Sequence, residues 1–501
     1  MKNSLLNYYK YHPFRTLLIV GIFFRIIAAI FSEGFAFQDD HFLVIEKAQH
    51  WVDGIKNDWL PKYGGKHASG NSFLYPGLHY ILFEILHFFG LDNPNVKMLI
   101  VRILHAFYNL LIVYFGFKIT KILSNQQSAI RVSWLLSIFW VFPLLSVRNL
   151  VEYVCIVPLL YSLYLILKNP PSTSFIRYLL IGFIAGIAFS IRFQTILFIG
   201  GFGLVFLLNK QFLQAIYFGI GALLSIVIFQ GIVDYIIWGQ PFAEFIEYTN
   251  YNLHHSGDYP NGPWYNYTLL LLGLFILPLG FYFFWGMGFR FKKYIWLTLP
   301  TAIFFVFHSY FPNKQERFIL TMLPMFIMAG SMGWDEFCVK SKWWQKHQNT
   351  NKNIWRWIWT INTLLLLFLT PASTKVSKLR VMNYFRERGD VSYFVLETTQ
   401  MWGSVLMPRF YHGVWNETYL VTQEHSAKEL FEAINSSQSP KPSHVVFAEP
   451  KDLDIRVQRV KDQVKNLVFE KQIESSYLDK TMVWLNPVNV NQTYYIYRIE
   501  Y

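Results

Sequence analysis

The chain up to residue 372 consists of long apolar runs separated by short polar segments. A helix needs about 20 mostly apolar residues to cross the hydrocarbon core of a bilayer. Eleven runs approach this length, near 15–33, 97–117, 132–147, 152–168, 177–191, 194–208, 214–238, 268–288, 294–309, 317–336 and 354–372. The pattern predicts a polytopic all-α membrane protein whose module at 1–372 holds about 11 transmembrane helices.

The pattern changes at residue 373, where polar and charged residues become frequent. Strand-like runs occur at 393–396, 418–421, 444–448, 482–485 and 494–499, with helical patterns at 426–435 and 454–466. Strands that alternate with helices indicate a small α/β domain, which we expect at 373–501. Two triplets in it, at 416–418 and 491–493, fit an N-glycosylation pattern. The domain could cap the active face and bind an acceptor or partner, or it could only stabilise the module.

Composition agrees with the membrane assignment and limits the function classes. Of the 501 residues, 53% are hydrophobic and only 15% are charged, whereas soluble domains carry about 25% charged residues. This excludes an ordinary cytosolic enzyme. The formal net charge of +13 would suit a nucleic-acid partner if the basic residues formed a patch.

The positions of the basic residues instead indicate a membrane orientation. They gather in alternate short loops, at 118–131, 168–177, 210, 290–293 and 340–356, whereas the loop at 239–267 has no Lys or Arg. Cytoplasmic loops of membrane proteins carry an excess of Lys and Arg. We therefore expect a cytoplasmic N-terminus, no nucleic-acid partner, and an active site and C-terminal domain on the extracytoplasmic (periplasmic or lumenal) face.

The first extracytoplasmic loop, 34–96, is far longer than a connector, and long loops in compact proteins are usually functional. Residues 39–52 have the apolar spacing of an amphipathic helix with Asp39 or Asp40 as its N-cap. Glu46 follows Asp39 by seven residues, so both side chains could point the same way. The aspartates could simply cap a helix outside the membrane, or one of them could act as a general base. Residues 73–90 look re-entrant or interfacial.

Several ionisable residues lie in or beside the apolar runs: Arg25, Arg102, Arg148, Glu152, Arg192 and Asp234. Such groups are costly in a membrane and suggest function, although each could also be a snorkelling side chain or part of a structural ion pair. Arg148 and Glu152 are four residues apart and could pair with each other. The segment 308–318 places Lys314, Glu316 and Arg317 at the outer face. Two cations there suit a lipid phosphate, although a polar turn with interfacial anchors is the plainer alternative.

These motifs resemble the α-mannosyltransferases of glycosyltransferase family 22, which includes the GPI-anchor and lipid-linked-oligosaccharide enzymes. The matching residues are His308…Lys314-x-Glu316-Arg317-Phe318 with Pro324, Gln38-Asp39-Asp40 with Glu46, Gly182…Gly186…Arg192, and Asp234…Gly239…Asn250 with Pro263-Trp264-Tyr265. Asn313 stands where the family has His, Gln315 separates Lys from Glu, and Asp40 replaces a Glu. The segment of Arg148 and Glu152 matches only weakly. The resemblance covers roughly residues 10–340.

The resemblance implies a GT-C fold and a sugar transferase, with mannose as the expected sugar. The donor would be a polyprenyl-phosphate sugar in the membrane lipid and the acceptor an extracytoplasmic glycan or glycolipid, with inversion at the anomeric carbon. Asp39 falls on the family's catalytic base, and Asp40 would assist it or only cap the helix. Lys314 and Arg317, with Arg192 and His308 behind them, would bind the donor phosphate. Glu46, Glu316 and Asp234 would bind substrate, although Glu316 could instead orient Arg317. No metal or other cofactor is expected.

Three alternatives remain open from the sequence. A lipid or sugar transporter would be expected to contain repeats, and none is evident in the sequence. Another GT-C enzyme could transfer a different sugar, such as arabinose or an aminosugar. An O-antigen polymerase or ligase would place its largest loop late in the chain instead of directly after the first run.

Overall fold

The computed structural model describes residues 11–54, 68–258, 261–399, 406–415, 419–423, 426–436, 441–486, 489 and 492–501. The predicted glycosylation triplet at 416–418, Asn491 of the triplet at 491–493, and residues 55–67 of the first loop lie outside the described residues. The chain divides into two compact units. The first unit comprises Met1–Ala29, Lys56–Leu78 and Val101–Thr370, and the second comprises Ile30–Ile55, His79–Ile100 and Pro371–Tyr501. The second unit therefore contains two pieces of the first loop together with the C-terminal region.

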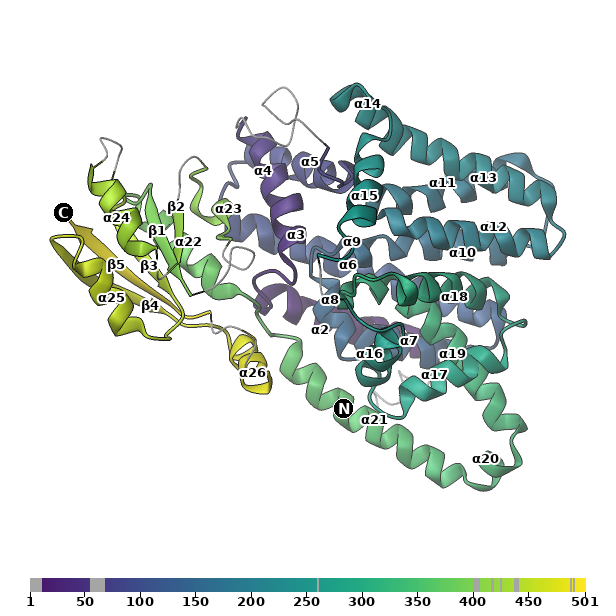
Figure 1. Ribbon diagram of the computed structural model, residues 1–501. Helices are drawn as coiled ribbons and strands as arrows, with labels where there is room; N and C mark the ends of the chain where they lie inside the picture. Colours follow the sequence, from purple (N-terminus) through teal and green to yellow (C-terminus); the bar gives the residue numbers. More distant parts are fainter. Residues whose placement is uncertain are drawn as a thin grey trace. The chain divides into compact units, whose positions relative to one another are not determined.

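The apolar runs form the helices of a multi-pass membrane protein (Figure 1). In chain order these are α2 (Pro13–Phe31), α5 (Leu74–Phe88), α6 (Pro94–Leu123), α7 (Gln126–Ile138), α8 (Val141–Ser146), α9 (Val151–Val154), α10 (Ile156–Lys168), α11 (Phe175–Ile191), α12 (Ile196–Leu208), α13 (Phe212–Ile226), α14 (Val233–Trp238), α15 (Ala243–His254), α16 (Asn266–Leu274), α17 (Leu279–Phe289), α18 (Ile295–Tyr310), α19 (Leu323–Lys340), α20 (Lys342–Lys346) and α21 (Gln348–Leu369). Short 3₁₀ or π segments join some of them: η3 (Phe193–Thr195), η4 (Val227–Ile232) and η5 (Glu316–Met322).

Not every apolar run is one straight spanning helix. Among the described residues, five helical stretches are long and apolar enough to cross a membrane, and the pair α16 and α17, bent by 117°, could count as a sixth. Three shorter apolar helices lie at 175–191, 193–208 and 295–310. The run near 132–147 is divided between α7 and α8, because the helix breaks at Phe139 and Trp140. The helical architecture is confirmed. Fewer of the described helices are long and apolar enough to cross a membrane than the eleven runs suggest.

The backbones of α11 and α13 are in close contact. A Cβ atom on Gly182 would lie 1.9 Å from the carbonyl oxygen of Phe218, and one on Gly221 would lie 1.9 Å from that of Leu179. Small residues allow membrane helices to approach this closely, and Figure 1 shows the two helices side by side. The glycines that resemble the family's Gly-rich span therefore act in packing, and α11 ends directly before Arg192.

Two of the intramembrane arginines bind backbone carbonyl groups. Arg25, 1% exposed, donates from Nη1 to Ser137 O at 2.8 Å and from Nη2 to Leu136 O at 3.3 Å, at the end of α7. Arg102 donates from Nε to Ala29 O at 2.7 Å. The last carbonyl groups of a helix have no partner within the helix, so Arg25 supplies one for α7. These contacts support the structural reading of both residues.

The C-terminal part of the second unit contains a five-stranded sheet in the order β2-β1-β3-β5-β4. The strands are β1 (Phe394–Thr398), β2 (Tyr419–Gln423), β3 (His444–Ala448), β4 (Asn466–Ile473) and β5 (Tyr494–Glu500). Strands β2, β1 and β3 are parallel, whereas β5 is antiparallel to both β3 and β4. Its helices are α22 (Val376–Arg388), α23 (Arg409–His412), α24 (Ala427–Ser436), α25 (Leu453–Lys461) and α26 (Tyr477–Leu485).

Two sequence predictions in this region were wrong. Residues 482–485 form the end of helix α26 and not a strand, because Ser476 accepts a hydrogen bond from Asp479 N at 3.0 Å and starts a helix there. The helix predicted at 454–466 ends at Lys461, and residue 466 begins β4. Short apolar runs do not distinguish helix from strand by periodicity alone.

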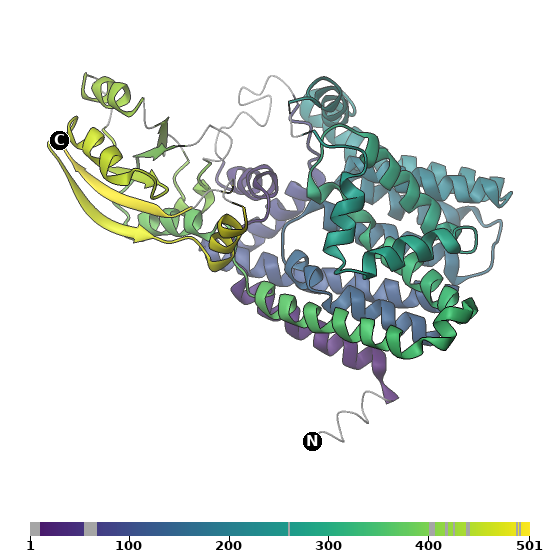
Figure 2. The same cartoon turned by 60° about the horizontal axis from the view of Figure 1, so that its bottom comes forward.

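Helices cover both faces of the sheet (Figures 1 and 2). Phe431 of α24 and Val460 of α25 pack with Val395, Val445 and Phe447 in one buried cluster. On the other face, Phe385 of α22 lies against the rings of Phe394 and His444. Successive residues of a strand point to opposite faces, which explains why adjacent positions of β1 and β3 serve different helices.

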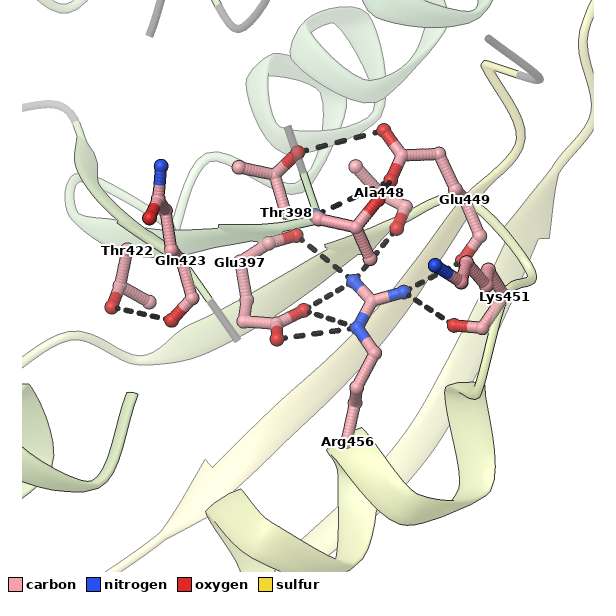
Figure 3. A network of polar contacts seen from close by, with 9 residues as sticks. Glu397, Thr398, Thr422, Gln423, Ala448, Glu449, Lys451 and Arg456 are labelled. Carbon is pink, nitrogen blue, oxygen red and sulfur yellow. Dashed lines mark hydrogen bonds and ion pairs between the residues drawn. The ribbon is translucent and has the colours of Figure 1, made fainter. Parts of the chain in front are cut away.

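A buried arginine binds side-chain and backbone oxygens at the carboxyl ends of β1 and β3 (Figure 3). Arg456 of α25 pairs with Glu397, and both side chains are at most 1% exposed. Its Nη2 also donates to Ala448 O at 2.7 Å, and its Nη1 donates to Glu449 O at 3.1 Å and Lys451 O at 3.0 Å. Glu449 has a positive φ of 65°, so these bonds hold a backbone turn that a non-glycine residue rarely adopts.

Candidate functional site

Three charged residues from separate elements meet inside the first unit. Glu152 of α9 lies 2.9 Å from Arg192 (Oε1 to Nη1) and 3.5 Å from Arg317 (Oε1 to Nε). The exposed fractions of the side chains are 0%, 12% and 9% for Glu152, Arg192 and Arg317. The structure therefore brings together two of the predicted phosphate-binding arginines. Glu152 pairs with these residues, so the suggested Arg148–Glu152 pair was wrong: α8 ends at Ser146, α9 begins at Val151, and the two residues share no helix.

This arginine cluster (Glu152, Arg192 and Arg317) contains polar atoms whose hydrogen bonds are incomplete. Both carboxylate oxygens of Glu152 and Nη2 of Arg192 are buried and have no aligned hydrogen-bond partner among the described residues. Buried polar atoms in folded proteins nearly always have partners, and exceptions require an explanation such as an absent ligand. Two guanidinium groups face one carboxylate, so the cluster has an excess of positive charge. An anion with several oxygen acceptors would complete it.

An aromatic ring supports both arginines. Phe318, next to Arg317 in η5, lies 5.2 Å from the guanidinium carbon of Arg192 and 5.7 Å from that of Arg317, measured to the ring centroid. Arginine stacks well on aromatic faces. Thr321 of the same segment donates to the backbone oxygen of Glu152 at 2.8 Å. Together these contacts fix η5 against α9 and limit the positions that the guanidinium groups can take.

Lys314 lies close to the cluster but is already bound. Its Nζ donates to His308 O at 2.8 Å, to Ser309 O at 2.7 Å and to Phe311 O. An ammonium group has three donors, so all of them bind the end of α18 and the turn after it. In this arrangement Lys314 contributes charge to the site and a cap to α18, whereas a direct hydrogen bond to phosphate would require its side chain to move.

His308, Gln315 and Glu316 occupy different surroundings. His308 is 3% exposed, and its Nδ1 donates to Phe304 O at 2.9 Å because a carbonyl can only accept. The carbonyl contact therefore occupies Nδ1, and only Nε2 could face a ligand. Glu316 is exposed and has no hydrogen bond or ion pair with a described residue. Gln315, which interrupts the family motif, is the residue that accepts from Arg317 Nε, at 2.9 Å. The hypothesis that Glu316 orients Arg317 was therefore wrong.

Asp234, predicted to bind substrate, lies away from solvent in α14. Its Oδ2 accepts from Gln230 Nε2 at 2.8 Å and from Glu244 N at 3.0 Å. The carboxylate of Glu244 in turn accepts from Ser69 Oγ at 3.1 Å and Trp238 Nε1 at 3.0 Å. This network holds the start of α15, since the first N–H groups of a helix need outside acceptors. No motif in the sequence indicated a role for Glu244, which lies in the first turn of α15.

In the second unit, the predicted helix of the first loop is confirmed and runs through α3 (Gln38–Asp40), η1 (His41–Glu46) and α4 (Lys47–Val52). Its N-cap is Phe37 and neither aspartate, so that part of the prediction was wrong. Asp39 is exposed, whereas Asp40 is only 4% exposed. Of the two, Asp39 therefore has the carboxylate that a hydroxyl substrate could reach.

Glu46 differs sharply from Asp39. It is 7% exposed, accepts from Phe410 N at 3.2 Å, and lies 3.7 Å from His41 Nε2. Burial raises the pKa of Glu46 to about 8, although the Phe410 N–H and the charge of Arg409 oppose this shift. The shared direction predicted for Asp39 and Glu46 was wrong, because residues 41–46 are π-helical and the wider turn changes the face on which later residues lie.

The second half of the same helix packs on the C-terminal region. Trp415 donates from Nε1 to Asp53 Oδ2 at 2.7 Å, and its ring lies 4.0 Å from that of His50. Tyr411 stacks on His41. His41 and His50 are therefore used in packing. Among the residues that the structure describes, no group of three His, Cys, Asp or Glu side chains is placed to hold a metal ion.

Comparisons with known proteins agree with this arrangement. No curated protein matches the chain by sequence. The crystal structure of ArnT from Cupriavidus metallidurans bound to undecaprenyl phosphate has a TM-score of 0.61 and 12% identity, and the match covers 96% of this chain and 97% of that one. The apo structure of the same protein has a TM-score of 0.60, again at 12% identity, and the match covers 96% and 97% of the two chains. These likenesses show that the fold is GT-C.

Family membership rests on a match by sequence. The model of the Alg9-like mannosyltransferase family matches residues 16–401, more than half of the chain. It includes α9, the end of α11, η5 and the first-loop helix, and so covers every residue discussed above as a candidate. The chain therefore belongs to the Alg9-like mannosyltransferase family and is a multi-pass membrane glycosyltransferase.

Proposed function

We propose that the protein transfers mannose from a polyprenyl-phosphate donor to a hydroxyl of an extracytoplasmic glycan or glycolipid, with inversion at the anomeric carbon. The observation that carries the proposal is the arginine cluster, in which Arg192 Nη2 and the Glu152 carboxylate lack aligned hydrogen-bond partners among the described residues. Membership of the mannosyltransferase family supports mannose. The neighbour of the same fold that is bound to undecaprenyl phosphate supports a lipid phosphate as the carrier.

The chemistry is a single displacement. The acceptor oxygen forms a bond to the anomeric carbon while the bond from that carbon to the phosphate oxygen breaks. The hydroxyl proton goes to Asp39, which is exposed and so accessible to the acceptor, and polyprenyl phosphate leaves as an anion. One base suffices for an inverting reaction of this kind, whereas a retaining reaction needs a second carboxylate as nucleophile.

Arg192 and Arg317 supply the charge that the leaving phosphate needs. Arginine matches phosphate oxygens in a fork geometry, and fixed donors aimed at developing charge are an effective form of catalysis. We propose that these two cations, with Lys314 contributing charge only, serve this purpose without a metal ion. Activity that persists after treatment with a chelator would agree with this, and activity restored only by an added divalent cation would contradict it.

The test is a transfer assay on purified protein in lipid, with a panel of polyprenyl-phosphate sugars. We expect mannose to be transferred and the product linkage to be α from a β-linked donor. Transfer of arabinose or an aminosugar in place of mannose would overturn the sugar assignment. Retention of the anomeric configuration would overturn the mechanism.

The role of the base is tested by Asp39→Asn beside Asp40→Asn. Loss of a general base typically costs at least about 100-fold in rate, so we expect such a loss for Asp39→Asn with donor binding unchanged. Asp40 is buried, so its variant should lose less turnover and more thermal stability. Wild-type turnover in Asp39→Asn would remove Asp39 from the mechanism.

A further inference from the structure

A cavity of about 890 Å³ lies in the first unit among the start of α7, the end of α19 and the start of α21. Its lining includes Ser128, Arg131, Trp334, Lys352 and Arg356. None of these residues belongs to the arginine cluster or to the first-loop helix. In Figure 1, α20 joins α19 to α21 at this end of the helices.

The two sites lie at opposite ends of one membrane-spanning stretch. Glu316–Lys340 is continuous through η5 and α19 and is apolar enough to cross a bilayer. Arg317 lies at its beginning, whereas Trp334 and Lys340 line the cavity at its end. With a rise of about 1.5 Å per residue, the ends are roughly 35 Å apart, which is about the thickness of the hydrocarbon core plus part of the interface. The cavity is therefore separate from the proposed donor site.

The charges that line the cavity leave an excess of cations. Asp335 is paired with Arg131 and accepts from Ser128 Oγ at 2.9 Å. Glu336 is paired with Arg290 and Lys293, which lie in the turn directly after α17. Both acids are thus neutralised.

Three lining cations remain: Lys340, Lys352 and Arg356. None of them has an acidic partner within the described part of the chain, where Arg356 Nη1 donates only to Asn353 Oδ1, at 3.2 Å. The cavity therefore suits a negatively charged group, such as a phosphate.

The polar cavity borders an apolar groove. A second hollow of about 460 Å³ shares three residues with the cavity: Gln127, Arg131 and Trp359. It is otherwise lined by Ile130, Trp134 and Ile138. Those three residues are spaced four apart, so they form one stripe along α7. A free phosphate would leave this groove empty. A molecule with an anionic head and an apolar chain would fill both hollows.

We propose that the cavity and groove bind an anionic diacyl phospholipid, with its phosphate headgroup beside Lys352 and Arg356 and an acyl chain along α7. Basic pockets between transmembrane helices are suited to anionic lipid headgroups. Trp355 and Trp359, on the same helix as Arg356, lie among the lining residues, and tryptophan is favoured at the membrane interface. Arg131 lies over the ring of Trp355, at 5.7 Å from its centroid, which fixes one wall of the site.

The experiment is native mass spectrometry of the full-length protein in neutral detergent, titrated with phosphatidylglycerol or with phosphatidylcholine of the same acyl chains. The test variant is the double substitution Lys352→Gln with Arg356→Gln. The matched control is Lys342→Gln with Lys346→Gln, because these lysines are exposed on α20 and do not line the cavity. Both variants lose two positive charges from the same part of the chain.

We expect wild type and control to retain one phosphatidylglycerol about tenfold more tightly than phosphatidylcholine, and the test variant to lose this preference. Equal retention by test variant and control would overturn the proposal, as would equal binding of the two lipids by wild type. If inorganic phosphate at millimolar concentration displaces the lipid, or if polyprenyl phosphate binds there more tightly, the assigned ligand is wrong. Sugar transfer by the test variant should match wild type, so failure here and failure of the proposed function are distinguishable.

Discussion

Each unit of the protein buries a contact between arginine and glutamate, and the two contacts are completed differently. In the second unit, Arg456 binds Glu397 and three backbone carbonyls, so the nitrogens of its guanidinium group all have acceptors (Figure 3). In the first unit, Arg192 contacts Glu152 at ion-pair distance, but its Nη2 has no partner among the described residues. The same two residue types therefore serve structure in one unit and leave room for a ligand in the other.

The largest expected effect is on stability, from breaking the completed pair. Arg456→Met would leave Glu397 buried without its cation, and removing one partner of a buried pair typically costs about 3–5 kcal/mol. We expect the C-terminal sheet to unfold at a lower temperature and to become sensitive to protease. Lys461→Met on the same helix, where the side chain is exposed, is the control. If Arg456→Met lowered the free energy of unfolding by less than about 1 kcal/mol, the Arg456–Glu397 and Arg192–Glu152 pairs would differ less than their hydrogen bonds suggest.

The second expected effect is on function, from changing the incomplete pair. Arg192→Gln should reduce the rate of transfer or the donor affinity by about 100-fold, the usual loss when one donor to a developing charge is removed. Its thermal stability should change little, because Arg317 remains beside Glu152. The control is Arg15→Gln, an exposed residue of α2. A large loss of stability with normal donor binding would place Arg192 in the same structural class as Arg456.

A third test uses Glu46, a buried carboxylate that makes no ion pair with an arginine among the described residues. Because burial raises the pKa of Glu46 to about 8, the folded protein keeps a proton that the unfolded chain, with a pKa near 4.5, releases. The stability that this proton provides is fully present below about pH 4.5 and is lost as the pH rises to 8, by up to about 1.4 kcal/mol per pH unit.

Glu46→Gln removes this pH dependence, since glutamine does not titrate. We expect the melting temperature of the variant minus that of wild type to increase between pH 6 and pH 8. Glu387→Gln, an exposed position of α22, should show no such increase. A constant difference across this range would mean that Glu46 is already ionised in the folded protein.

The sequence predicted those parts of the molecule that depend on local patterns. The apolar runs, the helix at 38–52 and the two arginines of the cluster followed from hydrophobicity, spacing and resemblance. The partners of those residues did not, because Glu152, Arg192 and Arg317 are far apart in the chain and only tertiary packing brings them together. Gln315 was read as an interruption of a motif, yet it binds Arg317. Asp234 was predicted to bind substrate from the resemblance, and the sequence did not show that its carboxylate also accepts hydrogen bonds from Gln230 and from the start of α15.

The smallest expected effect concerns Lys314, which has features of both classes. Its three donors are all bound to backbone carbonyls at the end of α18 and just after it, and the guanidinium nitrogens of Arg456 also all have acceptors. Lys314 nevertheless lies three residues before Arg317 of the incomplete cluster. A cation at a helix C-terminus contributes up to about 1–2 kcal/mol, so Lys314→Met should lower thermal stability by about that amount and weaken the donor affinity only a few-fold through lost charge. Lys314→Arg keeps the charge but not the compact three-donor geometry, so it should retain donor affinity better than stability. Suppose instead that Lys314→Met loses donor binding as completely as Arg192→Gln and melts at the wild-type temperature. The lysine must then leave the carbonyls when the donor binds. In that case, complete hydrogen bonding in the free protein would no longer distinguish structural from functional cations.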